Sequence, residues 1–146
     1  MITYDTTTTT SSSNNNKDKD NDKPPARLLV VDDDPDTVRV LGLCLQNYGF
    51  LVDAFSNPKD ALQEIKSNPG SYSLVLSDGL MPELSGIQLA EKVKERNPNV
   101  KVLLLTGSEV ADNDFSKVFP STSVDGFLQK PVSIRKLTDK ILSLLD

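Results

Sequence analysis

Short apolar runs alternate with amphipathic helical patterns from residue 27 to the end of this chain, and this alternation limits the possible folds most. The runs are candidate strands at residues 27–31, 50–55, 73–77, 100–105 and 125–129. Three of them are continuously apolar, as expected of strands covered on both faces. Five strands that alternate with helices indicate an α/β fold, a doubly wound parallel sheet with helices on both faces. In such folds, ligands bind at the carboxyl ends of the strands.

Capping residues mark the predicted helices between the strands. The first two helices follow Asp34 and Asn57, each an N-cap residue that precedes a proline suited to the first helical turn. A third helix ends before Asn97, a weakly apolar fourth covers residues 110–119, and a fifth follows Ser133. The sequence therefore predicts five helices.

Residues 1–25 have a composition unlike that of the rest of the chain. They are mainly Thr, Ser, Asn, Lys and Asp, and two adjacent prolines close the segment. Such a segment cannot bury enough apolar surface to offset its chain entropy. We therefore predict a disordered low-complexity tail over residues 1–25, acting as an inert tether, and a single domain over residues 26–146.

Charge and the scarcity of some residue types exclude several classes of function. The net charge is −5 and no basic cluster is present, which argues against nucleic-acid binding. The chain has no histidine and one cysteine, Cys44, so His-based triads, Cys/His zinc sites and internal disulfides are excluded. Neither a signal peptide nor an apolar run of the ~20 residues that span a membrane is present. We expect a cytoplasmic protein without membrane contact, whose chemistry relies on carboxylates, hydroxyls and lysines.

Polar residues occupy the predicted carboxyl ends of four strands. Asp32 and Asp33 follow the first strand, Asp78 the third, Thr106 the fourth and Lys130 the fifth. Carboxylates that lie close together repel one another, and a divalent cation with oxygen ligands, such as Mg²⁺, relieves that repulsion. A cation and a lysine can neutralise a phosphoryl group in transfer, a hydroxyl can donate to it, and an aspartate can accept it as an acyl phosphate.

Four motifs at these strand ends resemble a known family. The segments LLVVDDDPD, LVLSDGLMPELSG, VLLLTG and GFLQKP are similar to the signatures of the receiver domain of two-component response regulators. They occur in the order and approximate spacing of that family, and the resemblance covers residues 27–146. It implies a flavodoxin-like sheet with the strand order 2-1-3-4-5.

The resemblance also implies roles for the acidic residues. Asp78 matches the aspartate that accepts the phosphoryl group, and Asp32 and Asp33 match the acidic pair that holds Mg²⁺ together with Asp78. Leu80 matches the position whose backbone carbonyl also binds the metal. Asp34 is better explained as a helix cap than as a metal ligand.

The remaining matched positions stabilise the phosphoryl group or respond to it. Thr106 and Lys130 match the hydroxyl and the lysine that contact phosphoryl oxygens. Phe127 matches the aromatic switch residue that moves together with Thr106, although plain core packing explains it equally well. Since proline lowers the cost of a cis bond to about 0.5–1 kcal/mol, the peptide bond before Pro131 is predicted to be cis and to aim Lys130 at the site. Gly79 departs from the family, which usually has a larger apolar residue there.

The function implied is that of a response regulator receiver, a phosphoacceptor in signal transduction and not an enzyme that acts on other substrates. A histidine kinase or a histidine phosphotransfer protein would donate the phosphoryl group from phosphohistidine. No output domain follows the fifth helix, so we expect a stand-alone receiver that signals through protein contacts or a phosphorelay. Two alternatives remain: a scaffold that works without phosphorylation, and an Mg²⁺-dependent phosphohydrolase of the haloacid dehalogenase type.

Overall fold

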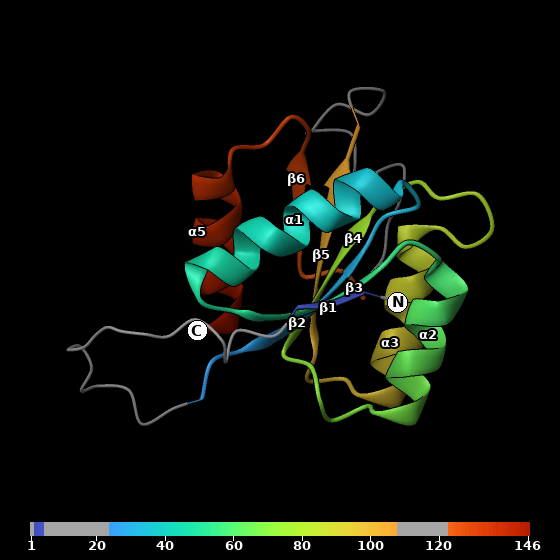
Figure 1. The fold of residues 1–146 in the computed structure, drawn as a ribbon. Helices are drawn as coiled ribbons and strands as arrows, with labels where there is room; N and C mark the ends of the chain where they lie inside the picture. Colours follow the sequence, from blue (N-terminus) through green and yellow to red (C-terminus); the bar gives the residue numbers. More distant parts are fainter. Residues whose placement is uncertain (1, 5–23, 108–122) are drawn as a thin grey trace.

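The sheet at the centre of the molecule has six strands (Figure 1). The computed structural model describes residues 2–4, 24–107 and 123–146. Five strands are parallel: β2 (Arg27–Val31), β3 (Leu51–Phe55), β4 (Leu74–Asp78), β5 (Lys101–Thr106) and β6 (Gly126–Gln129). They lie in the order β3-β2-β4-β5-β6, which is 2-1-3-4-5 when counted along the chain. The predicted doubly wound, flavodoxin-like fold is therefore confirmed.

β1 (Ile2–Tyr4) is a further strand beyond the five that the sequence predicts. It pairs antiparallel with β3, at the edge of the sheet opposite β6. The five predicted parallel strands are thus joined by one antiparallel strand at the edge, while the low-complexity tail over residues 1–25 stays a prediction. The physical reason is that β3 would otherwise end the sheet with unpaired backbone groups, while β-branched and aromatic residues favour strands. The rest of the predicted tail, residues 5–23, lies outside the described residues.

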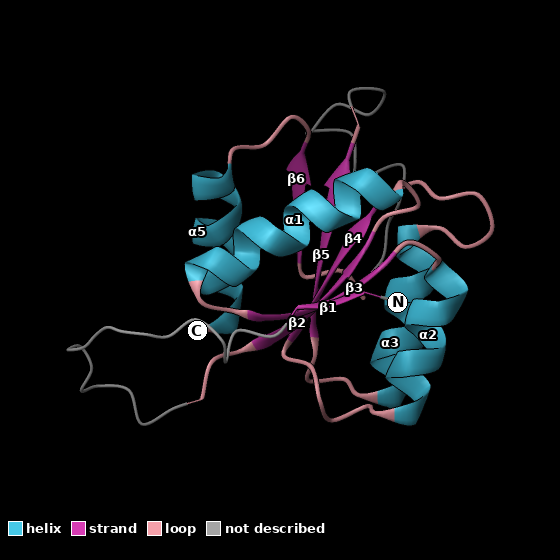
Figure 2. Cartoon of the chain, viewed as in Figure 1, coloured by secondary structure: helices cyan, strands magenta, loops and turns pink. Residues whose placement is uncertain are grey.

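Two helices cover each face of the sheet within the described part of the chain (Figure 2). These are α1 (Pro35–Tyr48) and α5 (Ile134–Leu145) on one face, and α2 (Pro58–Ser67) and α3 (Gly86–Arg96) on the other. The predicted N-caps Asp34, Asn57 and Ser133 are confirmed, because each side chain accepts a hydrogen bond from a backbone N–H of the first turn. The expected fourth helix lies outside the described residues. No described helix is both long enough and apolar enough to span a bilayer.

Alternate residues of the parallel strands fill two apolar layers, one beneath each pair of helices. In β2, Leu28 and Val30 pack on the side of α1 and α5, whereas Leu29 and Val31 pack on the side of α2 and α3. All four side chains are buried. Burial on both faces explains why these strand sequences are continuously apolar. It also fixes the positions of the strand ends, where the polar residues lie.

Candidate functional site

The carboxyl ends of four parallel strands bring the predicted site residues to one end of the sheet. Asp32 follows β2, Asp78 and Thr106 are the last residues of β4 and β5, and Lys130 follows β6. These strands are consecutive in the sheet, in the order β2-β4-β5-β6. The chain order reverses at β2, which has β3 on one side and β4 on the other. This is the place where doubly wound folds bind ligands.

Three aspartates form the acidic part of the site. Carboxylate oxygens of Asp32, Asp33 and Asp78 lie within 4.8 Å of one another. The side chain of Asp32 is 4% exposed and that of Asp78 13%, whereas Asp33 is exposed to solvent. A set of carboxylate oxygens with one side open to water matches the ligands that Mg²⁺ prefers, since this ion keeps several water ligands.

The ammonium group of Lys130 lies between two of these carboxylates. Its Nζ atom is 3.5 Å from Oδ2 of Asp32 and 3.4 Å from Oδ1 of Asp78. Burial alone would lower the pKa of Lys130, but the charges of Asp78 and Asp32 outweigh burial and raise it. Burial, together with the neighbouring Asp78, raises the pKa of Asp32, although the N–H of Asp34 and the charge of Lys130 act against this. The single positive charge of Lys130 therefore faces more than one carboxylate, and negative charge is in excess at this site.

The loop after β2 fixes Asp32 and separates it from Asp34. The N–H of Asp34 donates to Oδ1 of Asp32 at 2.9 Å, and the N–H of Asp32 donates to the carbonyl of Phe55 at 3.2 Å. The side chain of Asp34 instead accepts from the Thr37 hydroxyl and the Asp36 N–H, and these bonds lower its pKa. Asp34 thus caps α1, as the sequence predicts.

A closed loop joins Asp78 to the first residue of α3. The N–H of Gly79 donates to the carbonyl of Leu105 at 2.8 Å, and the N–H of Gly86 donates to the carbonyl of Gly79 at 3.1 Å. A Cβ atom at Gly86 would lie 2.6 Å from the backbone carbonyl oxygen of Asp78, which is closer than real Cβ contacts come. Position 86 therefore requires glycine. The sequence analysis assigned it no role, although a glycine that opens a helix is an unusual choice and is a usable signal.

The far side of the site is formed by β5 and β6. The N–H of Lys130 donates to the carbonyl of Thr106 at 2.7 Å, which fixes the start of the lysine loop. Among the residues that the structure describes, the hydroxyl of Thr106 has one long contact, 3.5 Å, to the carbonyl of Leu128. The peptide bond between Lys130 and Pro131 is cis, the geometry expected from the sequence.

Two further predicted residues lie nearby. Phe127 is the register partner of Leu104 in the neighbouring strand, and Leu104 lies two residues before Thr106. Phe127 and Thr106 are therefore on the same face of the sheet, and Phe127 packs against the apolar layer of that face. Leu80 lies in the loop after β4 with its side chain 47% exposed, and the metal-binding role of its carbonyl stays a prediction.

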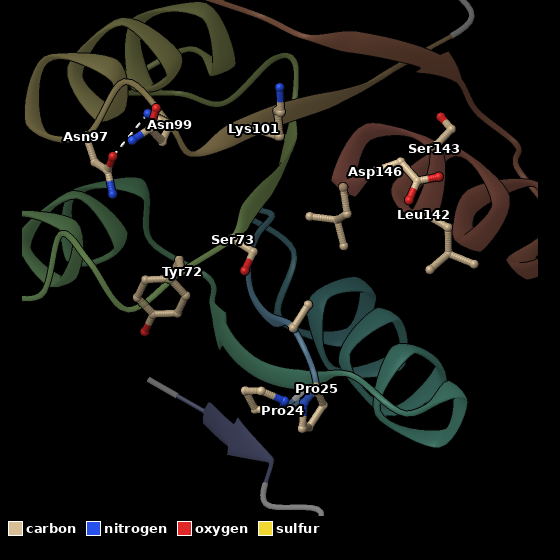
Figure 3. A pocket seen from close by; sticks show the side chains of 12 residues that line it. Pro24, Pro25, Tyr72, Ser73, Asn97, Asn99, Lys101, Leu142, Ser143 and Asp146 are labelled. Carbon is tan, nitrogen blue, oxygen red and sulfur yellow. Dashed lines mark hydrogen bonds between the residues drawn. The ribbon is translucent and has the colours of Figure 1, made fainter. Parts of the chain in front are cut away.

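A cavity of about 710 Å³ lies away from this site (Figure 3). Its lining includes Pro24, Pro25, Tyr72 and the end of α5, near the amino ends of the strands. Figure 3 shows one lysine, Lys101, and one carboxylate-bearing side chain, Asp146, on different elements around it. Its size alone therefore does not make it the functional site, because its described lining residues include no grouped set of charged side chains.

Comparison with known proteins gives consistent matches. The family model of the response regulator receiver domain matches residues 28–142. The response regulator receiver protein CpdR of Brucella abortus is 35% identical over 113 residues, which cover 77% of this chain and 90% of CpdR. The sensor kinase CckA of the same organism is 30% identical over 114 residues, which cover 77% of this chain and 12% of CckA. The chain thus spans a small part of that kinase.

Similarity extends to solved structures. The crystal structure of the response regulator protein TrrA of Thermotoga maritima, in complex with Mg²⁺-BeF, aligns with a TM-score of 0.69. The aligned sequences are 31% identical, and the alignment covers 82% of this chain and 98% of TrrA.

Proposed function

The chain belongs to the response regulator receiver domain family of two-component signalling, and from this premise we propose that Asp78 accepts a phosphoryl group from a phosphohistidine donor. The observation that carries the proposal is the place of Asp78. It ends a central strand with its carboxylate 3.4 Å from the Lys130 ammonium, beside two further aspartates. A receiver of this kind is a signalling domain and not an enzyme that acts on other substrates.

The proposed transfer uses groups of this chain around one reacting atom. A carboxylate oxygen of Asp78 attacks the phosphorus of phosphohistidine; a P–O bond forms as the P–N bond breaks, and the electron pair stays on the imidazole nitrogen. The Lys130 ammonium exchanges part of its contact with Asp78 for a phosphoryl oxygen. The Thr106 hydroxyl donates to the Leu128 carbonyl at 3.5 Å, and it would exchange this long contact for another phosphoryl oxygen.

We propose that Asp32, Asp33 and Asp78 hold Mg²⁺, with the backbone carbonyl of Leu80 as a further ligand. The grouping of the three carboxylates supports this assignment, and TrrA, a relative of similar fold, is described in complex with Mg²⁺-BeF. When bound, Mg²⁺ neutralises negative charge on the carboxylates and on the phosphoryl oxygens. Burial, followed by the charge of Asp78, raises the pKa of Asp32, so a bound cation would favour the charged form of this carboxylate.

The partner proposed as donor is a histidine kinase or a histidine phosphotransfer protein. An apolar groove of about 510 Å³ runs beside the site and is lined by Leu41, Leu105, Lys130 and Pro131, among others. On α1, next to it, Val40 is 59% exposed. A helix that carries the phosphohistidine could pack its apolar side on this groove and bring the phosphorus to Asp78. Both partners act in the cytoplasm, where we place this chain.

The proposed response to phosphorylation is a change at Thr106 and Phe127. When the Thr106 hydroxyl moves to a phosphoryl oxygen, it leaves space beside the apolar layer on which Phe127 packs. A local charge change would thus bias a packing equilibrium around β6. Amide NMR with beryllofluoride and Mg²⁺ tests this: shifts should extend to residues 123–135, and shifts restricted to the aspartate pocket would contradict the switch.

The phosphoacceptor function is tested with a small phosphodonor. The chain is incubated with acetyl phosphate and either Mg²⁺ or EDTA, and its intact mass is measured. We expect one added phosphoryl group with Mg²⁺ and none with EDTA. Hydroxylamine should remove the group, because it cleaves acyl phosphates but not phosphoserine or phosphothreonine. A mass that stays unchanged with Mg²⁺ would favour the phosphorylation-independent scaffold instead.

A further inference from the structure

The outer edge of β3 carries a strand that the five parallel strands do not require. β1 pairs with it over three residues: Ile2 with Ala54, Thr3 with Asp53 and Tyr4 with Val52. β3 itself runs from residue 51 to 55. The covered stretch is therefore the middle of an edge strand, on the side of the sheet far from β6.

The backbone groups at this edge can be assigned from the other side of β3. The N–H of Leu51 donates to Ala26, and the carbonyl of Phe55 accepts from the N–H of Asp32. Residues 51, 53 and 55 therefore direct their backbone groups toward β2. Because backbone groups alternate along a strand, the N–H and C=O groups of Val52 and Ala54 face outward, toward β1.

The pairing with β1 matters because β3 without it would expose these backbone groups to other molecules. A strand edge with free N–H and C=O groups is a template for pairing with another strand. Its residues include Val52 and Ala54, whose side chains are buried and hold the strand in an extended form. Removing β1 would thus leave an ordered, ready-made edge and not a frayed segment.

The connection between β1 and β2 is longer than capping within one molecule requires. Tyr4 lies opposite Val52, and Arg27 lies opposite Leu51, so both ends of the connection are at the same end of the sheet. Two strand spacings separate them, roughly 10 Å. Three or four extended residues would cover this distance, at about 3.3–3.6 Å each. Residues 5–26 make the connection, many more than this distance requires.

We propose that the outer edge of β3 can bind the Ile2–Tyr4 strand of a second copy of this chain when pairing with the chain's own strand is prevented. Within one molecule the strand caps its own edge, and two molecules exchange strands when that closure is prevented. The exchange is reciprocal, closes with two-fold symmetry and keeps every residue pair. A second copy is the partner because its strand fits the observed register without any change of sequence.

The first test uses two proline substitutions that differ only in which backbone group they remove. Tyr4 lies opposite Val52, so Tyr4→Pro removes an N–H that faces β3. The N–H of Thr3 faces away from β3, so Thr3→Pro keeps the pairing. We expect amide exchange of Val52 and Ala54 to rise about tenfold or more in Tyr4→Pro and to stay low in Thr3→Pro and in the unaltered chain. Residues 51, 53 and 55, which pair with β2, should be unaffected and show that the fold is intact. Fast exchange of Val52 and Ala54 in the unaltered chain would overturn the proposal.

The second test prevents closure. Deletion of residues 5–25 leaves a single residue between Tyr4 and Arg27, too short to reach back across β3. We expect light scattering to show a dimer for this variant and a monomer for the unaltered chain. Adding Tyr4→Pro to the deletion should return the monomer, and adding Thr3→Pro should not. A deletion variant that stays monomeric, or a dimer that Tyr4→Pro leaves intact, would overturn strand exchange between copies.

Discussion

Two clusters of acidic and basic side chains lie on the same sheet, each around a mostly buried carboxylate, and they differ in how closely their charges are paired. At the strand ends, Lys130 lies 3.5 Å from Asp32 and 3.4 Å from Asp78. In the middle of β3, Asp53 accepts a hydrogen bond from Arg27 at 3.1 Å and another from the Tyr72 hydroxyl at 2.5 Å. The first cluster has long contacts and the second has short ones.

The difference distinguishes a site in which several carboxylates share one cation from one in which the buried carboxylate has a cation of its own. Three aspartates face one lysine at the strand ends, so negative charge is left over for a cation. Asp53 is matched by one guanidinium and one hydroxyl, and Glu64 also lies 2.9 Å from that hydroxyl. Burial, followed by the hydrogen bonds to Asp53 and Glu64, raises the pKa of Tyr72, so it remains a proton donor. Burial of a carboxylate alone therefore does not identify a functional site.

The strongest expected contrast is in phosphorylation. Asp78→Asn should abolish labelling by acetyl phosphate, because the amide cannot form the acyl phosphate. Asp53→Asn, the matched change in the other cluster, should leave labelling in place, since Asp53 lies in a separate cluster within β3. Intact mass after incubation with phosphodonor and Mg²⁺ measures both. Labelling that survives Asp78→Asn would remove the basis of the assignment.

The second contrast is in stability. Tyr72→Phe removes the hydroxyl that donates to Asp53 and should cost about 1.5–3 kcal/mol of unfolding free energy, as for a buried hydrogen bond to a charged group. Urea unfolding measures this loss. Labelling of the folded variant should equal that of the unaltered chain. A loss of labelling without a loss of stability would mean that the two clusters are coupled.

The third contrast lies within the loop after β2. Asp33→Ala should weaken Mg²⁺ binding by about tenfold or more, equivalent to about 1.4 kcal/mol, whereas Asp34→Ala should change it little. Asp33 belongs to the carboxylate group, while Asp34 caps α1. Metal titration by calorimetry compares the two variants. Equal losses would show that the cap and the metal site are not separate.

The smallest expected effect is that of Asp32→Asn, which should stabilise the metal-free chain to an extent that depends on pH. The folded-state pKa of Asp32 is raised by burial, so its stabilising contribution is full below the ordinary value of 3.8 and is lost as pH rises through the raised value. Asp32→Asn should therefore stabilise the metal-free chain at neutral pH, by about 0.5–1 kcal/mol, the lower part of the usual range for stabilising changes. The gain should disappear at acid pH. Urea unfolding at both pH values checks this, and a gain that is independent of pH would contradict the assignment.

Much of the fold follows from local patterns in the sequence. All five parallel strands begin and end within one residue of the apolar runs, because burial on both faces requires continuous apolar sequence. The acidic site could be anticipated because Asp32 and Asp78 stand at strand ends, where parallel strands converge on one edge.

The remaining features depend on contacts between distant segments. β1 forms only because β3 offers a free edge, and three residues within a low-complexity stretch carry no periodic signal. The bonds from Arg27 and Tyr72 to Asp53 span 26 and 19 residues of sequence. No local pattern could reveal that these three side chains meet.

The close approach of Gly86 to Asp78 fixes the length of the loop between them. Most surface loops accept insertions and deletions, because only their ends are constrained. Here the helix that follows starts against the backbone carbonyl of Asp78, and any Cβ at position 86 would collide with it. A change in the length of residues 79–85 would place a side chain at that contact. Evolution of this chain can therefore vary the residues of the loop far more freely than their number.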